Sequence, residues 1–162
     1  MNITLPQEEI GLAYSLDIEV KNNAQAVIFL NYRSKTTQAT AAQFYGRVNV
    51  IGASNTDVRV ISNKLFKASS EFHENIDAII EDNSKLNIIA VELAKTDFIS
   101  SANVLLQGIN STAKIDIMYL GSGNQQLDMA YQVKHLGENT ESAITAKGIL
   151  KGQARKVFRD TI

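Results

Sequence analysis

Short segments in which apolar and polar residues alternate recur along most of the chain. Three clear examples are 57–61 (DVRVI), 114–120 (KIDIMYL) and 126–136 (QLDMAYQVKHL). Val, Ile, Tyr and Phe dominate these runs, as is typical of half-buried β-strands. Helical spacing is convincing nowhere; the segment 64–75 is the best helix candidate and could equally be a loop. The pattern therefore predicts an all-β chain.

Asparagine replaces the usual chain breakers between these segments. The chain has one proline and nine glycines, which is few for 162 residues. Asparagine tolerates the left-handed backbone region and caps turns with its side chain, so polar Asn clusters between apolar runs indicate turns. The candidate turn residues are Asn22, Asn23, Asn55, Asn83, Asn110, Asn124 and Asn139.

The turns recur at a nearly constant interval of about 29 residues, which indicates an internal repeat. Aligned copies begin at Asn23, Asn55, Asn83, Thr112 and Glu141, and each period contains a second turn and strand. The alignment predicts two inward columns: Ala26, Val58, Leu86, Ile115 and Ile144, and Ile28, Val60, Ile88, Ile117 and Ala146. We therefore expect a β-solenoid with two strands per coil, in which Ile88, Ile117 and Ala146 stack on one another.

A β-sandwich is the alternative architecture, because it also contains many short strands at 12–15-residue spacing. Sandwich strands have no reason to keep a constant register over four repeats. The solenoid is thus the preferred interpretation.

Composition narrows the functional classes. Sixteen basic and 17 acidic residues give a net charge of −1, which does not favour a nucleic-acid or anionic-membrane surface. The absence of cysteine excludes disulfides, thiolate metal ligation and a cysteine nucleophile. The N-terminal residues do not form a signal peptide, and no apolar run approaches the roughly 20 residues of a membrane span. We expect a single soluble domain, residues 1–162, in the cytoplasm.

The last 28 residues, HLGENTESAITAKGILKGQARKVFRDTI at 135–162, resemble the SufB/SufD family of iron–sulfur cluster assembly proteins, and SufD in particular. The matching motif is a histidine, a Gly-x-Asn-Thr-x-Ser turn, a Lys-Gly-Ile-Leu step and a closing aromatic-plus-basic strand. The residues at those places are His135, Gly137, Asn139, Thr140, Ser142, Lys147, Gly148, Ile149, Leu150, Phe158 and Arg159. The segment 79–93 is also similar to the family, and the resemblance covers about residues 11–162.

The resemblance implies a right-handed parallel β-helix that acts as a non-catalytic scaffold with SufB and the SufC ATPase. Asp160 stands where family members usually have glycine, and family members continue beyond this point with further coils and a SufC-docking helical region. We therefore expect a fragment of a longer protein or a short homologue, whose iron or cluster site would lie beyond Ile162. Family members pair through their β-helix domains, so a homodimer is expected for the isolated chain. The motif does not separate SufB from SufD.

No catalytic, cofactor-binding or metal site is predicted within the chain. His135 and His73 are the only imidazoles, and a metal site needs several ligands. His135 is interpreted as a strand-end residue that caps a turn or packs on a neighbouring coil, with an interface or metal role as the alternative. Phe158 and Ile162 are candidate interface or structural residues, because a coil that would cover them is missing; Val157 shares this position.

Other chemistry-bearing groups have simpler interpretations. The acidic pairs Glu8/Glu9 and Glu81/Asp82 fall at a terminus and a turn, where solvated charge is usual. Gly121–Gly123 lacks the Lys-Ser/Thr of a phosphate loop. The basic cluster 151–156 is a solvated turn or an interface patch.

Two functional classes remain open, and a structural spacer with no partner chemistry is a third alternative for a truncated form. The first is the SufD-like scaffold, without a cofactor bound by this chain alone. The second is a carbohydrate-active or ligand-binding β-helix, which would want aromatic platforms and clustered acids. The chain has no tryptophan and 11 Tyr or Phe residues, which gives the second class little support.

Overall fold

The computed structural model describes residues 1–5, 11–34, 43–66 and 71–162. Within these residues the chain forms twelve β-strands and no helix, which confirms the all-β prediction. The strands are β1 (Asn2–Leu5), β2 (Leu12–Val20), β3 (Gln25–Ser34), β4 (Phe44–Gly52), β5 (Asp57–Leu65), β6 (Phe72–Ile80), β7 (Lys85–Glu92), β8 (Phe98–Leu106), β9 (Thr112–Gly121), β10 (Gln126–His135), β11 (Glu141–Leu150) and β12 (Arg155–Thr161).

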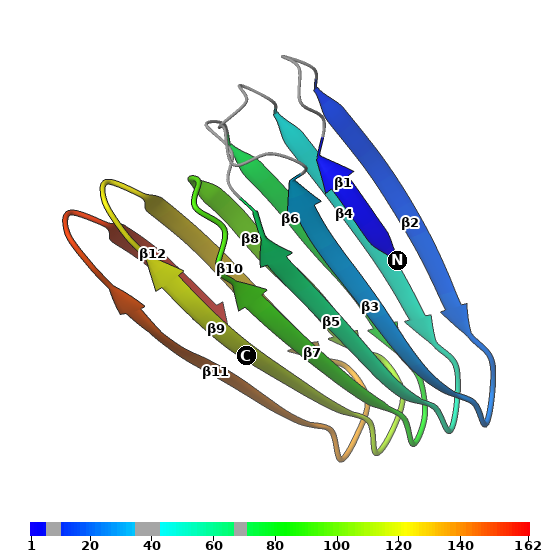
Figure 1. Ribbon diagram of the computed structural model, residues 1–162. Helices are drawn as coiled ribbons and strands as arrows, with labels where there is room; N and C mark the ends of the chain where they lie inside the picture. The colour runs from blue at the N-terminus through cyan, green and yellow to red at the C-terminus, as the bar shows by residue number, and fades with distance from the viewer. Residues whose placement is uncertain (6–10, 35–42, 67–70) are drawn as a thin grey trace.

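The strands alternate between two six-stranded sheets (Figure 1). The odd sheet has the order β1-β3-β5-β7-β9-β11, and the even sheet runs from β2 to β12 in the order β2-β4-β6-β8-β10-β12. Every pair of neighbouring strands is parallel. Each coil therefore adds one strand to each sheet, and the predicted two-strand solenoid is confirmed.

Asparagine closes each of the five turns that lead from the even sheet to the odd sheet. Five asparagines adopt a positive φ of 54–62°, in the left-handed region: Asn23, Asn55, Asn83, Asn110 and Asn139. Asn22 and Asn124 lie in turns without this conformation. In two of the opposite turns glycine takes the role, at Gly123 (φ 64°) and Gly152 (φ 75°). Two side-chain hydrogen bonds link Asn turns of adjacent coils, from Asn55 to Asn23 (3.2 Å) and from Asn110 to Asn83 (3.1 Å).

The predicted inward columns are wrong by two residues in the pairing of β7 with β9. Ile88 pairs with Ile115, and Ile117 lies between Ala90 and Ala146. The stacking of Ile117 on Ala146 is present, but that of Ile88 on Ile117 is not. The left-handed asparagines set the register, and Asn110 follows Asn83 by 27 residues rather than the assumed 29. A slip of two residues keeps each side chain on the same face of its strand, so the predicted inward face is unchanged.

The segment 64–75 is not a helix where the structure describes it. Lys64 and Leu65 end β5, and Phe72 begins β6; residues 67–70 lie outside the described part. The alternation is harder to recognise here because two inward positions carry charge. Lys64 and Glu74 point into the core, where a strand pattern would normally place apolar side chains.

The core fills the space between the two sheets along the whole stack. Ile88, Ile115 and Ile117 are almost completely buried on the odd sheet. On the even sheet, Phe44 and Phe72 stack with ring centroids 4.6 Å apart and planes at 4°. Phe98 follows Phe72 in the register, which continues an aromatic column parallel to the solenoid axis.

Candidate functional site

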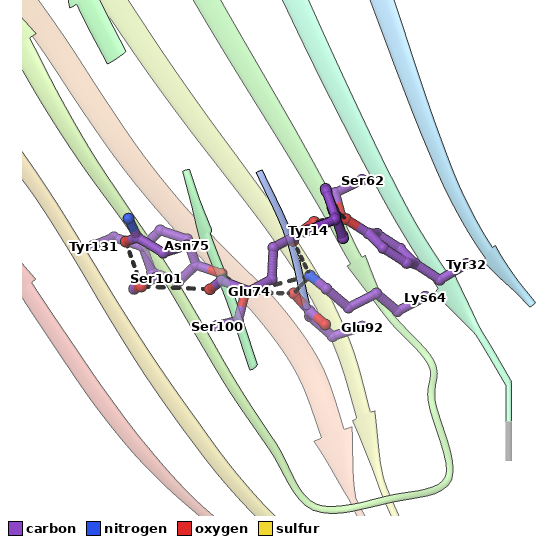
Figure 2. Close-up of polar contacts among 10 residues, drawn as sticks. All are labelled: Tyr14, Tyr32, Ser62, Lys64, Glu74, Asn75, Glu92, Ser100, Ser101 and Tyr131. Atoms are coloured by element: carbon purple, nitrogen blue, oxygen red, sulfur yellow. Dashed lines mark hydrogen bonds and ion pairs between the residues drawn. The ribbon is translucent and has the colours of Figure 1, made fainter. Parts of the chain in front are cut away.

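The most concentrated polar chemistry in the described residues lies inside the solenoid (Figure 2). Tyr32, Lys64 and Glu92 are consecutive register partners on the odd sheet. Glu74 and Ser100 are register partners on the even sheet. The strand alternation turns all five side chains inward, so they meet between the sheets. We call the group the interior cluster, with these members: Tyr14, Tyr32, Ser62, Lys64, Glu74, Glu92, Ser100 and Tyr131.

An ion pair shared by two carboxyl groups forms the centre of the interior cluster. The Nζ of Lys64 lies 2.6 Å from Oε2 of Glu74 and 2.6 Å from Oε1 of Glu92. The three side chains are at most 1% exposed. A buried pair of this kind is destabilising to break, because the remaining charge would have no partner.

Both carboxylate oxygens of Glu74 are hydrogen-bonded. The hydroxyl of Ser62 lies 2.8 Å from Oε2 and 3.0 Å from Oε1. The hydroxyl of Tyr32 donates to Oε1, and the hydroxyl of Tyr14 bonds to that of Tyr32. With Lys64 on Oε2, both oxygens of this carboxyl group have donor partners.

Glu92 has a different environment. Its Oε1 accepts from Lys64 and from the hydroxyl of Ser100 at 2.8 Å, and Ser100 bonds to Tyr131 at 3.1 Å. Its Oε2 is buried and has no hydrogen-bond partner. The two carboxyl groups that flank Lys64 are therefore not equivalent.

Burial and the ion pair shift the acid–base properties of the interior cluster. Burial alone would lower the pKa of Lys64, but the carboxyl groups of Glu74 and Glu92 raise it above its ordinary value. Burial is the largest cause that raises the pKa of Glu92. Burial also raises the pKa of Tyr14 to about 12 and those of Tyr32 and Tyr131 further. The tyrosines consequently remain neutral donors or acceptors across the ordinary pH range.

Sequence reasoning missed the interior cluster. Lys64 and Glu74 fell in the segment interpreted as helix or loop, and Glu92 had no assigned role. The signal was present in the alternation, because Lys64 follows the inward residues Val58, Val60 and Ser62 at period two. A charge at an inward position of a strand requires a buried partner.

His135, the candidate from the motif, ends β10 and bonds within the turn that follows. Its Nδ1 lies 2.7 Å from Oγ1 of Thr140, and its Nε2 lies 2.8 Å from Oγ of Ser142. Thr140 itself donates to the carbonyl of Gly137. Because that hydroxyl hydrogen is already used, Nδ1–H of His135 donates to Thr140. The imidazole thus ties β10 to the start of β11.

Phe158 and Ile162 lie in the final coil, as the sequence predicted, but their surroundings differ. Phe158 is half-buried, and its ring centroid lies 6.1 Å from that of Tyr131. Ile162 follows β12 and is 68% exposed, and Val157 is 51% exposed. Within the described residues, β11 and β12 each pair with one strand, so each presents a free edge.

The remaining sequence candidates do not come together. His73 packs on the ring of Tyr45 and lies 3.2 Å from Glu71. Glu81 and Asp82 lie in the turn after β6, where Asp82 accepts from the backbone N–H of Ile109. The segment 121–123 forms the turn between β9 and β10, and 151–156 spans a turn and the start of β12. Glu8 and Glu9 lie outside the described residues.

A shallow groove of about 360 Å³ crosses the outer face of the odd sheet near the starts of its strands. Charged and small polar residues of β5, β7, β9 and β11 dominate its lining, including Arg59, Lys85 and Lys114. The described lining contains no aromatic side chain, so it lacks the platform expected of a carbohydrate site.

No group of three or more His, Cys, Asp or Glu side chains is placed to hold a metal ion in the described ranges. In those same ranges, nothing qualifies as a membrane-spanning helix.

Comparisons with known proteins identify a family for the chain. The model of the family "SUF system FeS cluster assembly, SufBD core domain" matches residues 3–162. Over 81 residues, half of the chain, the sequence is 31% identical to the iron–sulfur cluster assembly SufBD family protein ABCI8, chloroplastic, of Arabidopsis thaliana. That alignment covers 14% of the length of the Arabidopsis protein. No solved structure matches the chain.

The family match covers almost the whole chain, and it includes the five Asn turns, His135 at the end of β10, and the final coil. The chain belongs to the SufBD core domain family of the SUF iron–sulfur cluster assembly system.

Proposed function

We propose that this chain is a non-catalytic, SufD-like scaffold subunit for iron–sulfur cluster assembly, and that it acts with a SufB-like protein and a SufC-like ATPase. The observation that carries the proposal is the match of the SufBD core model to residues 3–162. The relative in Arabidopsis, which is itself named as a cluster assembly protein, adds independent support.

The chemistry of the chain fits a scaffold better than a cluster-ligating protein. Iron–sulfur clusters are held mainly by cysteine thiolates, and the sequence contains none. Its two histidines lie on different strands of the even sheet, His73 on β6 and His135 at the end of β10. We therefore propose that iron or a cluster is cargo of an assembled complex and is not retained by this chain alone.

The final coil is the surface that we propose for pairing with another SufBD-type solenoid. Its two strands present free edges, and unpaired strand edges readily accept a strand from another chain. Apolar side chains are exposed there at Ile149 (67%) and Ile162 (68%). In the absence of a partner, the same surface would support a symmetric homodimer.

A cellular experiment tests the proposed function. The gene is deleted in its own organism, and the activity of a cluster-dependent dehydratase is measured during growth under iron limitation. We expect the activity to fall and the wild-type gene to restore it. Unchanged dehydratase activity and unchanged cluster content in the deletion strain would contradict the proposal.

Two variants expressed in the deletion strain test whether the final coil is needed for pairing. The Val157→Lys/Ile162→Lys variant places two charges on the final coil, where they oppose edge pairing. The Val27→Lys/Phe29→Lys variant is the matched control, because its residues are similarly exposed on β3, far along the stack from the final coil. We expect the control, but not the final-coil variant, to restore activity.

A further inference from the structure

The interior cluster contains two carboxyl groups and one ammonium group that are cut off from water. Lys64, Glu74 and Glu92 are at most 1% exposed at their side chains. If all three groups were ionised, the core would hold a net charge of −1. An uncompensated charge at such depth is strongly unfavourable, and a buried group usually changes its protonation state to remove it.

The hydrogen bonds show which carboxyl group is able to remain ionised. Both oxygens of Glu74 accept hydrogen bonds, from Tyr32, Ser62 and Lys64. Glu92 accepts hydrogen bonds at Oε1 only, from Lys64 and Ser100. Its Oε2 has no hydrogen-bond partner. An ionised Glu92 would leave a buried, partly charged oxygen without any donor, which is among the costliest arrangements in a protein core.

We propose that the interior cluster binds one exchangeable proton at neutral pH and that Oε2 of Glu92 carries it. The group of Lys64, Glu74 and Glu92 is then electrically neutral, as an ion pair between Lys64 and Glu74 beside a carboxylic acid. Lys64 lies at equal distances from the two carboxyl groups, so its position does not decide which of them is protonated. The other hydrogen bonds of Glu74 and Glu92 decide it.

The titratable and polar groups around Glu92 agree with a proton on its carboxyl group. Lys64 comes from β5, Glu74 from β6, Ser100 from β8 and Tyr131 from β10. Tyr119 of β9 is the register partner of Glu92. Tyr32 and Tyr14 complete the chain of titratable groups beyond Glu74. Among these groups, Lys64 is the cation, and its charge is matched by Glu74.

The bound proton links folding to pH. The pKa of Glu92 is raised above its ordinary value of 4.5, chiefly by burial, so the folded chain holds a proton that the unfolded chain releases. The stabilisation is complete below the ordinary value and declines as the pH rises toward the folded value. In that interval the folding equilibrium constant falls by about tenfold per pH unit on account of this group.

Infrared spectroscopy of the full chain at neutral pH tests the proposal directly, because the C=O stretch of a carboxylic acid is resolved from the stretches of a carboxylate. Chain labelled with ¹³C-glutamate separates Glu from Asp. We expect one buried acid band in the wild type, its loss in Glu92→Gln, and its retention in the surface control Glu81→Gln. The absence of an acid band in the wild type, or its persistence in Glu92→Gln, would overturn the proposal.

Thermal unfolding gives a second, independent readout. Glutamine is a neutral isostere of the protonated acid, so Glu92→Gln should change the melting temperature at pH 7 by less than about 4 °C. Glu74→Gln removes the ionised partner of Lys64 and should lower it by on the order of 10 °C. Between pH 5 and pH 8, wild-type stability should fall relative to Glu92→Gln. Equal losses in the two variants, failure of Glu92→Gln to fold, or a pH-independent difference would contradict the assignment.

Discussion

Each turn from the even sheet to the odd sheet uses one asparagine in the left-handed region. The φ angles of these five residues fall within 54–62°, although their sequence spacing varies. A Cβ atom makes this conformation unfavourable for most residues, whereas asparagine tolerates it because its side chain bonds locally. The turn residue therefore sets where each coil ends, and the interval between successive asparagines sets the register of the strands that follow.

The turn at Asn83 provides a stability test at the residue scale. We expect Asn83→Ala to lower the free energy of unfolding by about 1–2 kcal/mol, because alanine is strained at φ 54°. The variant also removes the acceptor of the 3.1 Å hydrogen bond from Asn110. Urea denaturation measures the loss. Asn83→Gly should recover part of it, and Asn22→Ala, outside the left-handed region, should have little effect; equal effects of Asn22→Ala and Asn83→Ala would contradict this explanation.

The buried lysine provides a second residue-scale prediction. We expect Lys64→Met to destabilise the chain by about 3–5 kcal/mol at pH 7, because a buried carboxylate loses its cation partner. Acid should reduce this deficit, because lower pH removes unpaired negative charge from the buried cluster. In the wild type the raised pKa of Lys64 makes its stabilisation complete below its ordinary value of 10.5, with loss only as the pH rises through the folded value. Chemical denaturation at pH 4, 7 and 10 measures these differences.

The exposed Lys85 serves as the control for that series. Lys85→Met makes the same Lys-to-Met substitution on β7, at a side chain that faces solvent. We expect it to change the free energy of unfolding by less than about 0.5 kcal/mol at each pH. A Lys64→Met deficit that does not depend on pH would contradict the electrostatic explanation.

At the scale of elements, the strands were predictable and their exact pairing was not. Alternation identifies inward positions such as Ile115 and Ile117 because side chains on a strand have period two. The pairing of Ile88 with Ile115 depends on where the preceding turn closes, and the alternation is unaffected by a two-residue slip. The left-handed asparagines, used as the alignment points, would have given the correct register.

One candidate site could be predicted from the sequence, and the other could not. His135 could be identified from its local motif, and its bonds to Thr140 and Ser142 are also local. The interior cluster joins Lys64 to Glu74 and Glu92, which lie on different strands and in both sheets. Such contacts depend on the final register of several coils. They could not be derived while 64–75 was interpreted as a helix or a loop.

The inward face of β9 provides the element-scale test. Ile117 is 1% exposed, and its neighbour Met118 is 51% exposed on the opposite face of the same strand. We expect Ile117→Asp to abolish folding, because an unpaired charge in the core costs several kcal/mol. Met118→Asp should leave the fold intact. Circular dichroism and the elution volume of each variant measure the outcome; a folded Ile117→Asp protein would contradict the assigned face.

At the scale of the whole molecule, the solenoid has a mainly apolar interior that the interior cluster interrupts. The two sheets continue to β11 and β12, whose outer edges have no strand partner in the described residues. Apolar residues of the final coil remain exposed, as is typical of surfaces that join another chain. We expect this surface to pair with another SufBD-type solenoid, as in the proposed function.

Self-association of the purified chain tests that expectation. Light scattering at micromolar concentrations should give the mass of a homodimer of the 17.8 kDa chain. The Val157→Lys/Ile162→Lys variant should be monomeric, and the Val27→Lys/Phe29→Lys control should remain dimeric. A wild-type monomer across that range would show that the final coil does not pair with itself.

Iron binding is expected to require a partner. The chain has no cysteine, and in the described residues neither histidine belongs to a group of three or more His, Cys, Asp or Glu side chains that could hold a metal ion. After anaerobic reconstitution with iron and sulfide, followed by desalting, we therefore expect no stoichiometric iron on the isolated chain. Metal analysis measures the retained iron. Retention of about one iron or one cluster per chain would contradict the argument from ligand count.

Native mass spectrometry of the chain mixed with the SufB-like and SufC-like proteins of its own organism measures whether the proposed complex forms. We expect a complex that contains all three proteins, with reconstituted iron only in species that include the SufB-like partner. We also expect Val157→Lys/Ile162→Lys to weaken the complex more than Val27→Lys/Phe29→Lys. A chain that stays apart from both partners, or that carries iron without them, would contradict the proposed function.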